Sequence, residues 1–103
     1  IVQVLRGIVD HGLAVDQAVA APRIHQSFLP DRARYESKRP LASEVLLGLK
    51  GRGHKIKGSH LAMGDANVLL LDNDLASGVA DPRGAGLALA AAVPAPLPAT
   101  NLP

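Results

Sequence analysis

The sequence contains no cysteine and almost no aromatic residues, and these two absences exclude several classes of protein. Without cysteine there is no disulfide scaffold, no zinc ribbon and no thiol nucleophile. Phe28 and Tyr35 are the only aromatic residues, so a core must be built from leucine, valine, isoleucine and alanine. Such a core is thin for an autonomous domain of 103 residues.

The sequence also lacks a long apolar run and a methionine at its first position. The longest nearly unbroken apolar stretch, 85–93, is about half as long as a membrane span and is followed by prolines. No positively charged start precedes an apolar run, so the sequence predicts neither a signal peptide nor membrane contact. Because the only methionine is Met63, we expect a processed product or a fragment.

Positive charge is concentrated in the middle of the chain. Residues 32–60 carry eight arginines and lysines against two glutamates, whereas residues 61–103 carry one arginine against four aspartates. One alternative function is therefore a non-catalytic binding module that uses the basic segment 32–60. We favour the interpretation that this segment is a solvated surface, and we predict no nucleic-acid partner. The reason is that no aromatic residue, which could stack on bases, lies among the last four basic residues of the segment; these are Lys50, Arg52, Lys55 and Lys57.

Two short helices are predicted in the first 21 residues. Residues 1–11 place six apolar side chains on one arc of a helical wheel, which predicts an amphipathic helix with one buried face; they are Ile1, Val2, Val4, Leu5, Ile8 and Val9. Gly12 can end this helix in the left-handed conformation that glycine tolerates. Asp16 is predicted to cap a second helix over 17–21, and Pro22 to stop it.

The middle of the chain is predicted to form a strand, a helix and a second strand. Residues 23–35 have mixed polarity and are expected to be an irregular segment that enters a strand. Pro40 can open a helix whose apolar residues recur every four positions, at Leu41, Val45 and Leu49. A short polar strand is expected over 54–57.

The last part of the chain is predicted to contain a β-hairpin and a tail. Residues 68–71 and 75–80 are apolar runs joined by Asp72-Asn73-Asp74, a combination typical of a hairpin. Residues 85–103 carry no charge and are rich in alanine and proline, so we expect residues 87–103 to be extended or disordered. One folded region over 1–84 and a tail over 85–103 are therefore predicted.

No pattern predicts a nucleophilic site. None of the serines lies in the Gly-x-Ser-x-Gly motif of hydrolases. Ser59 next to His60 is favoured as structural, because sequence neighbours rarely point at each other with triad geometry. The single threonine, Thr100, lies in the proline-rich tail.

The histidines and glycines predict neither a metal site nor a cofactor. Two Gly-x-Gly pairs, beginning at Gly51 and Gly84, lack the strand–turn–helix context of a dinucleotide loop. His25 is expected to form a hydrogen bond within a buried loop. The four histidines include no i, i+4 pair and have no cysteine to support them; they are His11, His25, His54 and His60.

The Asp81-Pro82-Arg83 sequence after the predicted hairpin allows three interpretations. It could form an ion pair, present Arg83 to an anion, or make a tight turn after the second strand. We favour the turn. The residues themselves therefore assign no catalytic, substrate-binding or metal-ligating position.

Six ordered blocks nevertheless carry a resemblance to a known family. They lie at 10–13, 16–26, 28–31, 49–55, 62–67 and 78–84, and include Ala-Pro-Arg-x-His at 21–25 and Asp-Pro-Arg at 81–83. In order and spacing they resemble the C-terminal part of the small subunit of γ-glutamyltranspeptidases. The resemblance implies an α+β fragment of an N-terminal-nucleophile hydrolase, a partial αββα sandwich to which this chain contributes helices and a terminal β-hairpin.

The resemblance also implies a function for a parent enzyme. Such enzymes cleave γ-glutamyl amides such as glutathione and pass the γ-glutamyl group to water or to an amino acid or peptide acceptor. The implied partners are the large subunit, the remainder of the small subunit and a γ-glutamyl substrate. The implied location is periplasmic, secreted or at the outer face of the plasma membrane.

The family's catalytic residues cannot be placed on this chain. The nucleophilic threonine and the glycines of the oxyanion hole precede the segment that begins at Ile1, and Thr100 matches no motif. Two departures from the family are the long extension after Asp-Pro-Arg and Asn67, where glutamine is common. We therefore predict that the chain alone is inactive; a related acylase that acts on another amide, such as a β-lactam side chain or poly-γ-glutamate, is the alternative within the fold.

Overall fold

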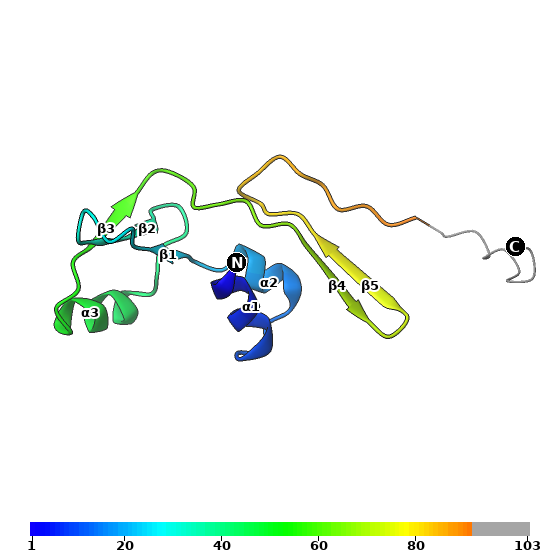
Figure 1. Ribbon diagram of the computed structural model, residues 1–103, viewed down its shortest axis with the longest axis horizontal. Coiled ribbons are helices and arrows are strands. Elements are labelled where there is room, and N and C mark those ends of the chain that lie inside the picture. Colours follow the sequence, from blue (N-terminus) through cyan, green and yellow to red (C-terminus); the bar gives the residue numbers. More distant parts are fainter. Residues whose placement is uncertain (92–103) are drawn as a thin grey trace, which may run out of the picture.

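The computed structural model describes residues 1–91, which form three helices and five strands (Figure 1). Within these residues no helix is long and apolar enough to cross a bilayer. The mixture of elements agrees with the predicted α+β class. In chain order they are α1 (Val2–Val9), α2 (Val15–Ala20), β1 (Ile24–His25), β2 (Ala33–Glu36), α3 (Ser43–Gly51), β3 (Ile56–Ser59), β4 (Val68–Asp72) and β5 (Leu75–Val79).

A three-stranded sheet with the order β1-β2-β3 occupies one end of the molecule, next to α3 (Figure 1). Strand β1 runs antiparallel to β2, and β3 runs parallel to β2. A parallel neighbour requires a crossover connection, and α3 provides it. The register aligns His25 with Arg34 and Arg34 with Lys57, so these three residues form one row across the sheet.

The predicted hairpin is confirmed as the antiparallel pair β4–β5. Its register runs from Val68 opposite Val79 to Asp72 opposite Leu75, which leaves Asn73 and Asp74 as a two-residue turn. Asn73 has a φ of 54°, in the left-handed region that asparagine tolerates better than most residues. The turn residues predicted from the sequence are therefore the residues that join β4 and β5.

The core is small and lies where the two N-terminal helices meet the hairpin. Val4, Ala18 and Val19 are buried, and the paired Val68 and Val79 pack against them from the hairpin. The two helices approach closely at Gly7, because a Cβ atom placed there would lie 3.2 Å from the Ala18 Cβ. Glycine at this position therefore sets the distance between α1 and α2.

The predicted first helix is present, but only part of its apolar face is buried in this structure. Of the six apolar residues on that arc only Val4 is buried, whereas Ile1, Leu5 and Val9 are 91%, 53% and 78% exposed. The reason is that α1 packs on α2 along Val4 and Gly7, and no other described segment covers the rest of the arc.

Three predicted boundaries also need correction. The second helix begins at Val15, and its N-cap is Ala14, whose amide donates to Gln17 Oε1 at 3.1 Å; Asp16 lies in the first turn instead. The third helix covers Ser43–Gly51, so it begins at Ser43 and not at Pro40. Strand β3 covers Ile56–Ser59 and not 54–57, because its pairing with β2 fixes its limits.

The predicted tail is only partly within the described residues. Residues 85–91 form no helix or strand, and Leu87 and Leu89 are exposed. Residues 92–103, including Thr100, lie outside the described part of the chain.

Candidate functional site

Four charged side chains that are distant in sequence meet in the interior, and we call them the arginine–carboxylate cluster. Its members are Arg23, Glu36, Asp81 and Arg83, so the cluster contains two positive and two negative groups. The Arg83 and Asp81 side chains are 1% and 0% exposed. Buried charges of this kind are tolerated only when they are paired and hydrogen-bonded.

Arg83 is at the centre of the cluster. Its Nε donates to both Glu36 carboxylate oxygens, at 2.7 and 2.8 Å, and its Nη1 donates to Asp81 Oδ1 at 3.2 Å. The two Nη atoms also donate to the carbonyl oxygens of Val19 and Ala21, at 2.8 and 2.9 Å. The hydrogen-bond acceptors around the Arg83 guanidinium therefore all come from the chain itself.

Arg83 thus decides between the three interpretations of the Asp81-Pro82-Arg83 sequence. The ion pair is confirmed, and the interpretation in which Arg83 is presented to an external anion is wrong, because its donors are used internally. A turn is present as well, since the Gly84 amide donates to the Asp81 carbonyl at 3.1 Å. The sequence could not indicate Glu36 as the partner, because it lies 47 positions away.

Arg23 closes the other side of the cluster. Its Nη2 lies 2.8 Å from Asp81 Oδ2 and donates to the Val19 carbonyl at 2.9 Å, while its Nη1 donates to the Met63 carbonyl at 2.8 Å. The Ala66 amide also donates to Asp81 Oδ2, at 2.8 Å. Within residues 1–91 no buried side-chain nitrogen or oxygen lacks a hydrogen-bond partner, so the cluster is fully satisfied.

The cluster keeps both carboxyl groups ionised. The Arg83 hydrogen bond is the main cause that lowers the pKa of Glu36, and it outweighs the opposing effect of burial. Burial alone would raise the pKa of Asp81, but the amides of Ala66 and Arg83 and the Arg23 guanidinium hold it well below its usual range. Neither carboxyl group can therefore act as a general acid near neutral pH.

The other residues that the sequence singled out form no catalytic arrangement within residues 1–91. Ser59 Oγ accepts a hydrogen bond from the Leu61 amide at 3.2 Å and has no bond to His60. His25 Nε2 lies 2.8 Å from Ser27 Oγ, so the expected local hydrogen bond exists, but His25 is exposed and not buried. Among residues 1–91, no group of three histidine or carboxylate side chains could hold a metal ion.

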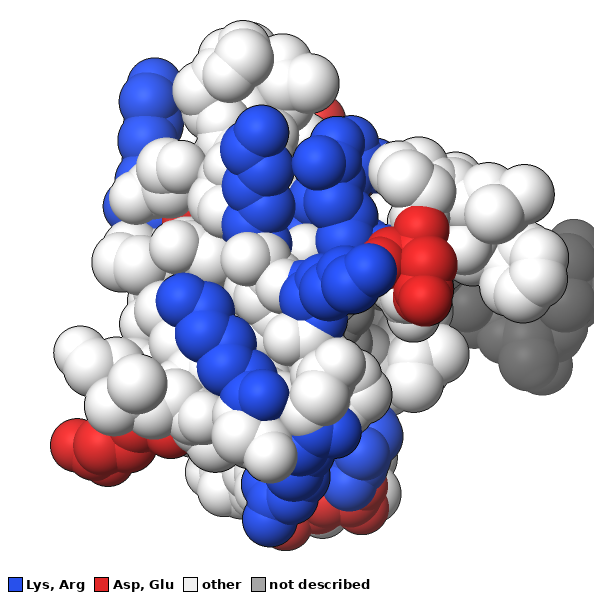
Figure 2. Space-filling view, turned by 90° about the vertical axis from the view of Figure 1, so that its left-hand side faces the viewer, with Lys and Arg blue, Asp and Glu red and all other residues white. Residues whose placement is uncertain are grey.

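Lysine and arginine gather at the end of the molecule that carries α3 and the three-stranded sheet (Figure 2). Seven of the eight basic residues in 32–60 are exposed, and none of the eight pairs with a carboxylate within residues 1–91. The eight are Arg32, Arg34, Lys38, Arg39, Lys50, Arg52, Lys55 and Lys57, of which Arg39 is half-buried. The predicted concentration of charge is thus an exposed basic surface in this structure.

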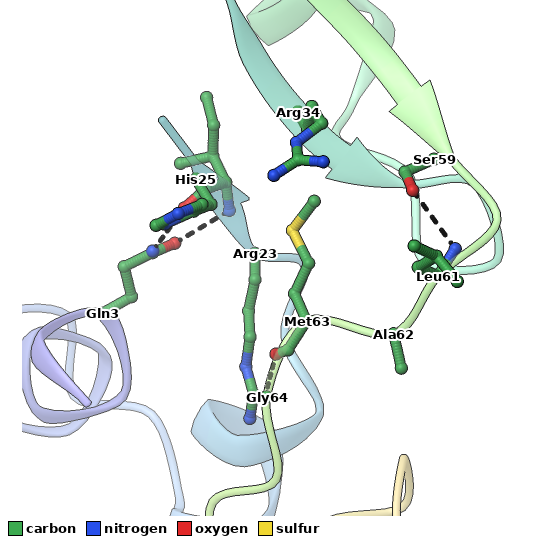
Figure 3. A pocket seen from close by; sticks show the side chains of 10 residues that line it. Gln3, Arg23, His25, Arg34, Ser59, Leu61, Ala62, Met63 and Gly64 are labelled. Atoms are coloured by element: carbon green, nitrogen blue, oxygen red, sulfur yellow. Dashed lines mark hydrogen bonds between the residues drawn. The ribbon is translucent and has the colours of Figure 1, made fainter. Parts of the chain in front are cut away.

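A pocket of about 390 Å³ lies between α1, the three-stranded sheet and residues 61–64 (Figure 3). At its edge, Gln3 bonds the Ile24 backbone twice, donating to the carbonyl at 2.7 Å and accepting from the amide at 3.1 Å. Arg34 and Met63 also line it. Arg23, His25 and Met63 of its lining lie in two of the blocks that carry the family resemblance, but only the fold brings these segments together.

A family model, two curated relatives and a solved structure indicate one family. The model of the family described as Gamma-glutamyltranspeptidase matches residues 1–91. The glutathione hydrolase proenzyme of Pseudomonas aeruginosa is 38% identical over 90 residues, which are 86% of this chain and 16% of that protein. The glutathione hydrolase proenzyme of Escherichia coli is 33% identical over 85 residues, which are 81% of this chain and 14% of that protein.

A solved structure supports the same relationship. The highly active W525D mutant of the gamma-glutamyltranspeptidase from Pseudomonas nitroreducens superposes with a TM-score of 0.80 at 31% sequence identity. The superposition covers 89% of this chain and 48% of that chain. The chain therefore spans less than half of this structural neighbour and only a small part of the curated relatives that it matches.

Proposed function

The chain belongs to the gamma-glutamyltranspeptidase family, and from this premise we propose that it is part of an enzyme that cleaves γ-glutamyl amides such as glutathione. The parent enzyme passes the γ-glutamyl group to water or to an amino acid or peptide acceptor. The observation that carries this proposal is the superposition on a gamma-glutamyltranspeptidase over 89% of the chain at a TM-score of 0.80. At 31% identity, this is a likeness of sequence as well as of fold.

The proposed place of the chain is the C-terminal part of the small subunit, within an αββα sandwich. Strands β4 and β5 support this placement, because they form a sheet of two strands among the described residues. Isolated two-stranded hairpins are at best marginally stable in water. We expect a strand from the rest of the parent to continue this sheet.

The large subunit and the remainder of the small subunit are the proposed partners. Apolar side chains on α1 and on the hairpin support this proposal, because each is more than half exposed; they are Ile1, Val2, Leu5, Val9, Leu69, Leu71 and Leu75. Soluble monomers rarely expose so many apolar side chains on neighbouring elements. The parent's other segments would bury them.

The proposed role of the chain is to support a catalytic centre that other segments supply. The arginine–carboxylate cluster supports this role, since its donors and acceptors are all used within the fold. It also joins the segments that carry the family resemblance, with Arg23 from one block and Asp81 and Arg83 from another. We propose the periplasm, the extracellular medium or the outer face of the plasma membrane as the location.

A chimera tests the proposed function. Residues 1–91 replace the matching segment of the Pseudomonas aeruginosa glutathione hydrolase proenzyme, and cleavage of a chromogenic γ-glutamyl anilide is measured with and without glycylglycine. We expect activity within about tenfold of the unaltered enzyme, a difference of roughly 1.4 kcal/mol in the barrier. The same chimera with Arg83→Gln is the control and is expected to be impaired.

Two outcomes would contradict the proposal. One is a soluble, folded chimera that does not cleave the γ-glutamyl anilide under conditions in which the unaltered enzyme does. The other is a chimera that prefers glutaryl anilide, which lacks the α-amine, because this preference would favour an acylase that acts on another amide.

A further inference from the structure

The pocket lined by Gln3, Arg34 and Met63 (Figure 3) lies against the three-stranded sheet, whose other face is covered by α3. On the covered face, Leu49 of α3 lies near Ala33 and Ile56. Side chains alternate along a strand, so Arg34 projects to the opposite face. A concave site of this size could hold a small organic molecule.

Arg34 is the positive group of this pocket that remains unneutralised. Arg23 also lines the pocket, but its guanidinium pairs with Asp81 at 2.8 Å. Arg34 forms no ion pair within residues 1–91. The sheet register places Lys57 next to Arg34 on the neighbouring strand, about 5 Å away, so a second positive residue lies in the same row of the sheet.

Ser59 contributes a second polar group on the same face of the sheet. Its Oγ accepts a hydrogen bond from the Leu61 amide at 3.2 Å, and a hydroxyl group that accepts can still donate its own hydrogen. Figure 3 shows Ser59 beside Leu61 and the Arg34 guanidinium near the end of the Met63 side chain. Arg34 and Ser59 are therefore both available to an acceptor in the pocket.

The remaining wall of the pocket is apolar. Leu61, Ala62 and Met63 come from the segment that follows β3, and Leu61 is 60% exposed. Methionine adapts its shape to irregular apolar ligands. A ligand that fits both halves of this pocket combines an anion with an apolar body.

We propose that this pocket binds a small organic carboxylate with an apolar body. The Arg34 guanidinium binds the carboxylate through two parallel hydrogen bonds, a geometry that arginine offers and lysine does not. The Ser59 hydroxyl donates to the same carboxylate, and the apolar body covers Leu61 and Met63. The pocket borders the arginine–carboxylate cluster, because Arg23 belongs to both, but the carboxylate is bound by Arg34 and Ser59, and the proposal does not depend on the proposed enzymatic function.

A titration followed by NMR tests the site on the full chain of 103 residues. The probe is 4-methylpentanoate, and the neutral 4-methylpentanamide is its matched control. We expect saturable shifts at the backbone amides of Arg34, Ser59 and Met63, with the carboxylate binding at least about tenfold more tightly than the amide. Arg34→Gln should weaken carboxylate binding about tenfold or more, because it removes the guanidinium that donates two parallel hydrogen bonds to the carboxylate.

A second variant with the same net charge as Arg34→Gln distinguishes binding at a specific site from a general effect of surface charge. Lys50→Gln removes one positive charge from exposed α3, and we expect it to change binding less than about twofold because salt screens distant surface charges. The proposal is overturned if no saturable shift occurs, if the acid and the amide bind equally, or if Lys50→Gln weakens binding as much as Arg34→Gln. If inorganic phosphate binds as tightly as 4-methylpentanoate, the ligand needs no apolar body and that part of the proposal is overturned.

Discussion

Arg83 and Glu36, which lie 47 positions apart, form a buried ion pair in which Nε donates to both carboxylate oxygens, at 2.7 and 2.8 Å. Glu36 is the last residue of β2, whereas Arg83 follows β5, so the pair connects the three-stranded sheet with the segment after the hairpin. Arg83 also bonds the carbonyls of Val19 and Ala21 at the end of α2. The stability of these three regions should therefore be coupled.

The first prediction concerns the loss of this pair. Arg83→Gln should lower the free energy of unfolding by about 3–5 kcal/mol, because it leaves buried carboxylates without a counter-charge. Urea denaturation followed by circular dichroism measures the change. Arg6→Gln is the control, since the Arg6–Asp10 pair is exposed and should contribute little. Equal effects of the two variants would contradict the prediction.

The second prediction concerns pH. The folded state lowers the pKa of both Glu36 and Asp81, so it favours their charged forms. Stability from these groups is therefore complete above about pH 5 and is lost as the pH falls through their unfolded values near 4 and then toward their lower folded values. The urea midpoint should accordingly fall steadily from pH 5 to pH 2.

Glu36→Gln provides the comparison for this pH dependence. It removes one of the two depressed carboxyl groups, so the variant should be less stable at pH 7 and its stability should fall less steeply in acid. If the urea midpoint of this variant depends on pH in the same way as that of the unaltered chain, Glu36 does not contribute to the loss of stability in acid.

The third prediction uses two helical glycines with different surroundings. Gly7→Leu should destabilise the chain by about 1–3 kcal/mol, because even a Cβ atom would lie 3.2 Å from the Ala18 Cβ. Gly48→Leu on α3 should be neutral or stabilising, since only Arg52 lies within 4 Å and leucine favours helix over glycine. Thermal unfolding of both variants checks this, and a more stable Gly7 variant would contradict the close approach of α1 and α2.

The fourth prediction is that the isolated chain does not cleave or transfer γ-glutamyl groups. Acyl transfer needs a nucleophile, a base and an oxyanion hole held together, and the loss of such a unit removes several orders of magnitude in rate. Purified chain is assayed with a chromogenic γ-glutamyl anilide, with and without glycylglycine. Turnover that survives Thr100→Ala would reveal an unrecognised site, and turnover abolished by it would make Thr100 the nucleophile.

Local chemistry explains why parts of the fold could be predicted. The β4–β5 hairpin follows from two apolar runs and from Asn73, whose left-handed φ is a property of the turn itself. The end of α3 reflects the same kind of local chemistry, since Gly53, two residues beyond its last residue, has a φ of 88°. By contrast, the N-cap at Ala14 was missed because the Gln17 side chain, and not Asp16, binds the exposed amide.

The sequence by itself determined the family, the α+β class, the hairpin and the concentration of positive charge in 32–60, because each is carried by neighbouring residues or by ordered blocks. Only the tertiary structure decided that Arg23, Glu36, Asp81 and Arg83 meet, and that Arg34 is left without a carboxylate partner in the described residues. The physical reason is that pairing between distant charges depends on strand register and helix packing, which place residues 47 positions apart within hydrogen-bond distance.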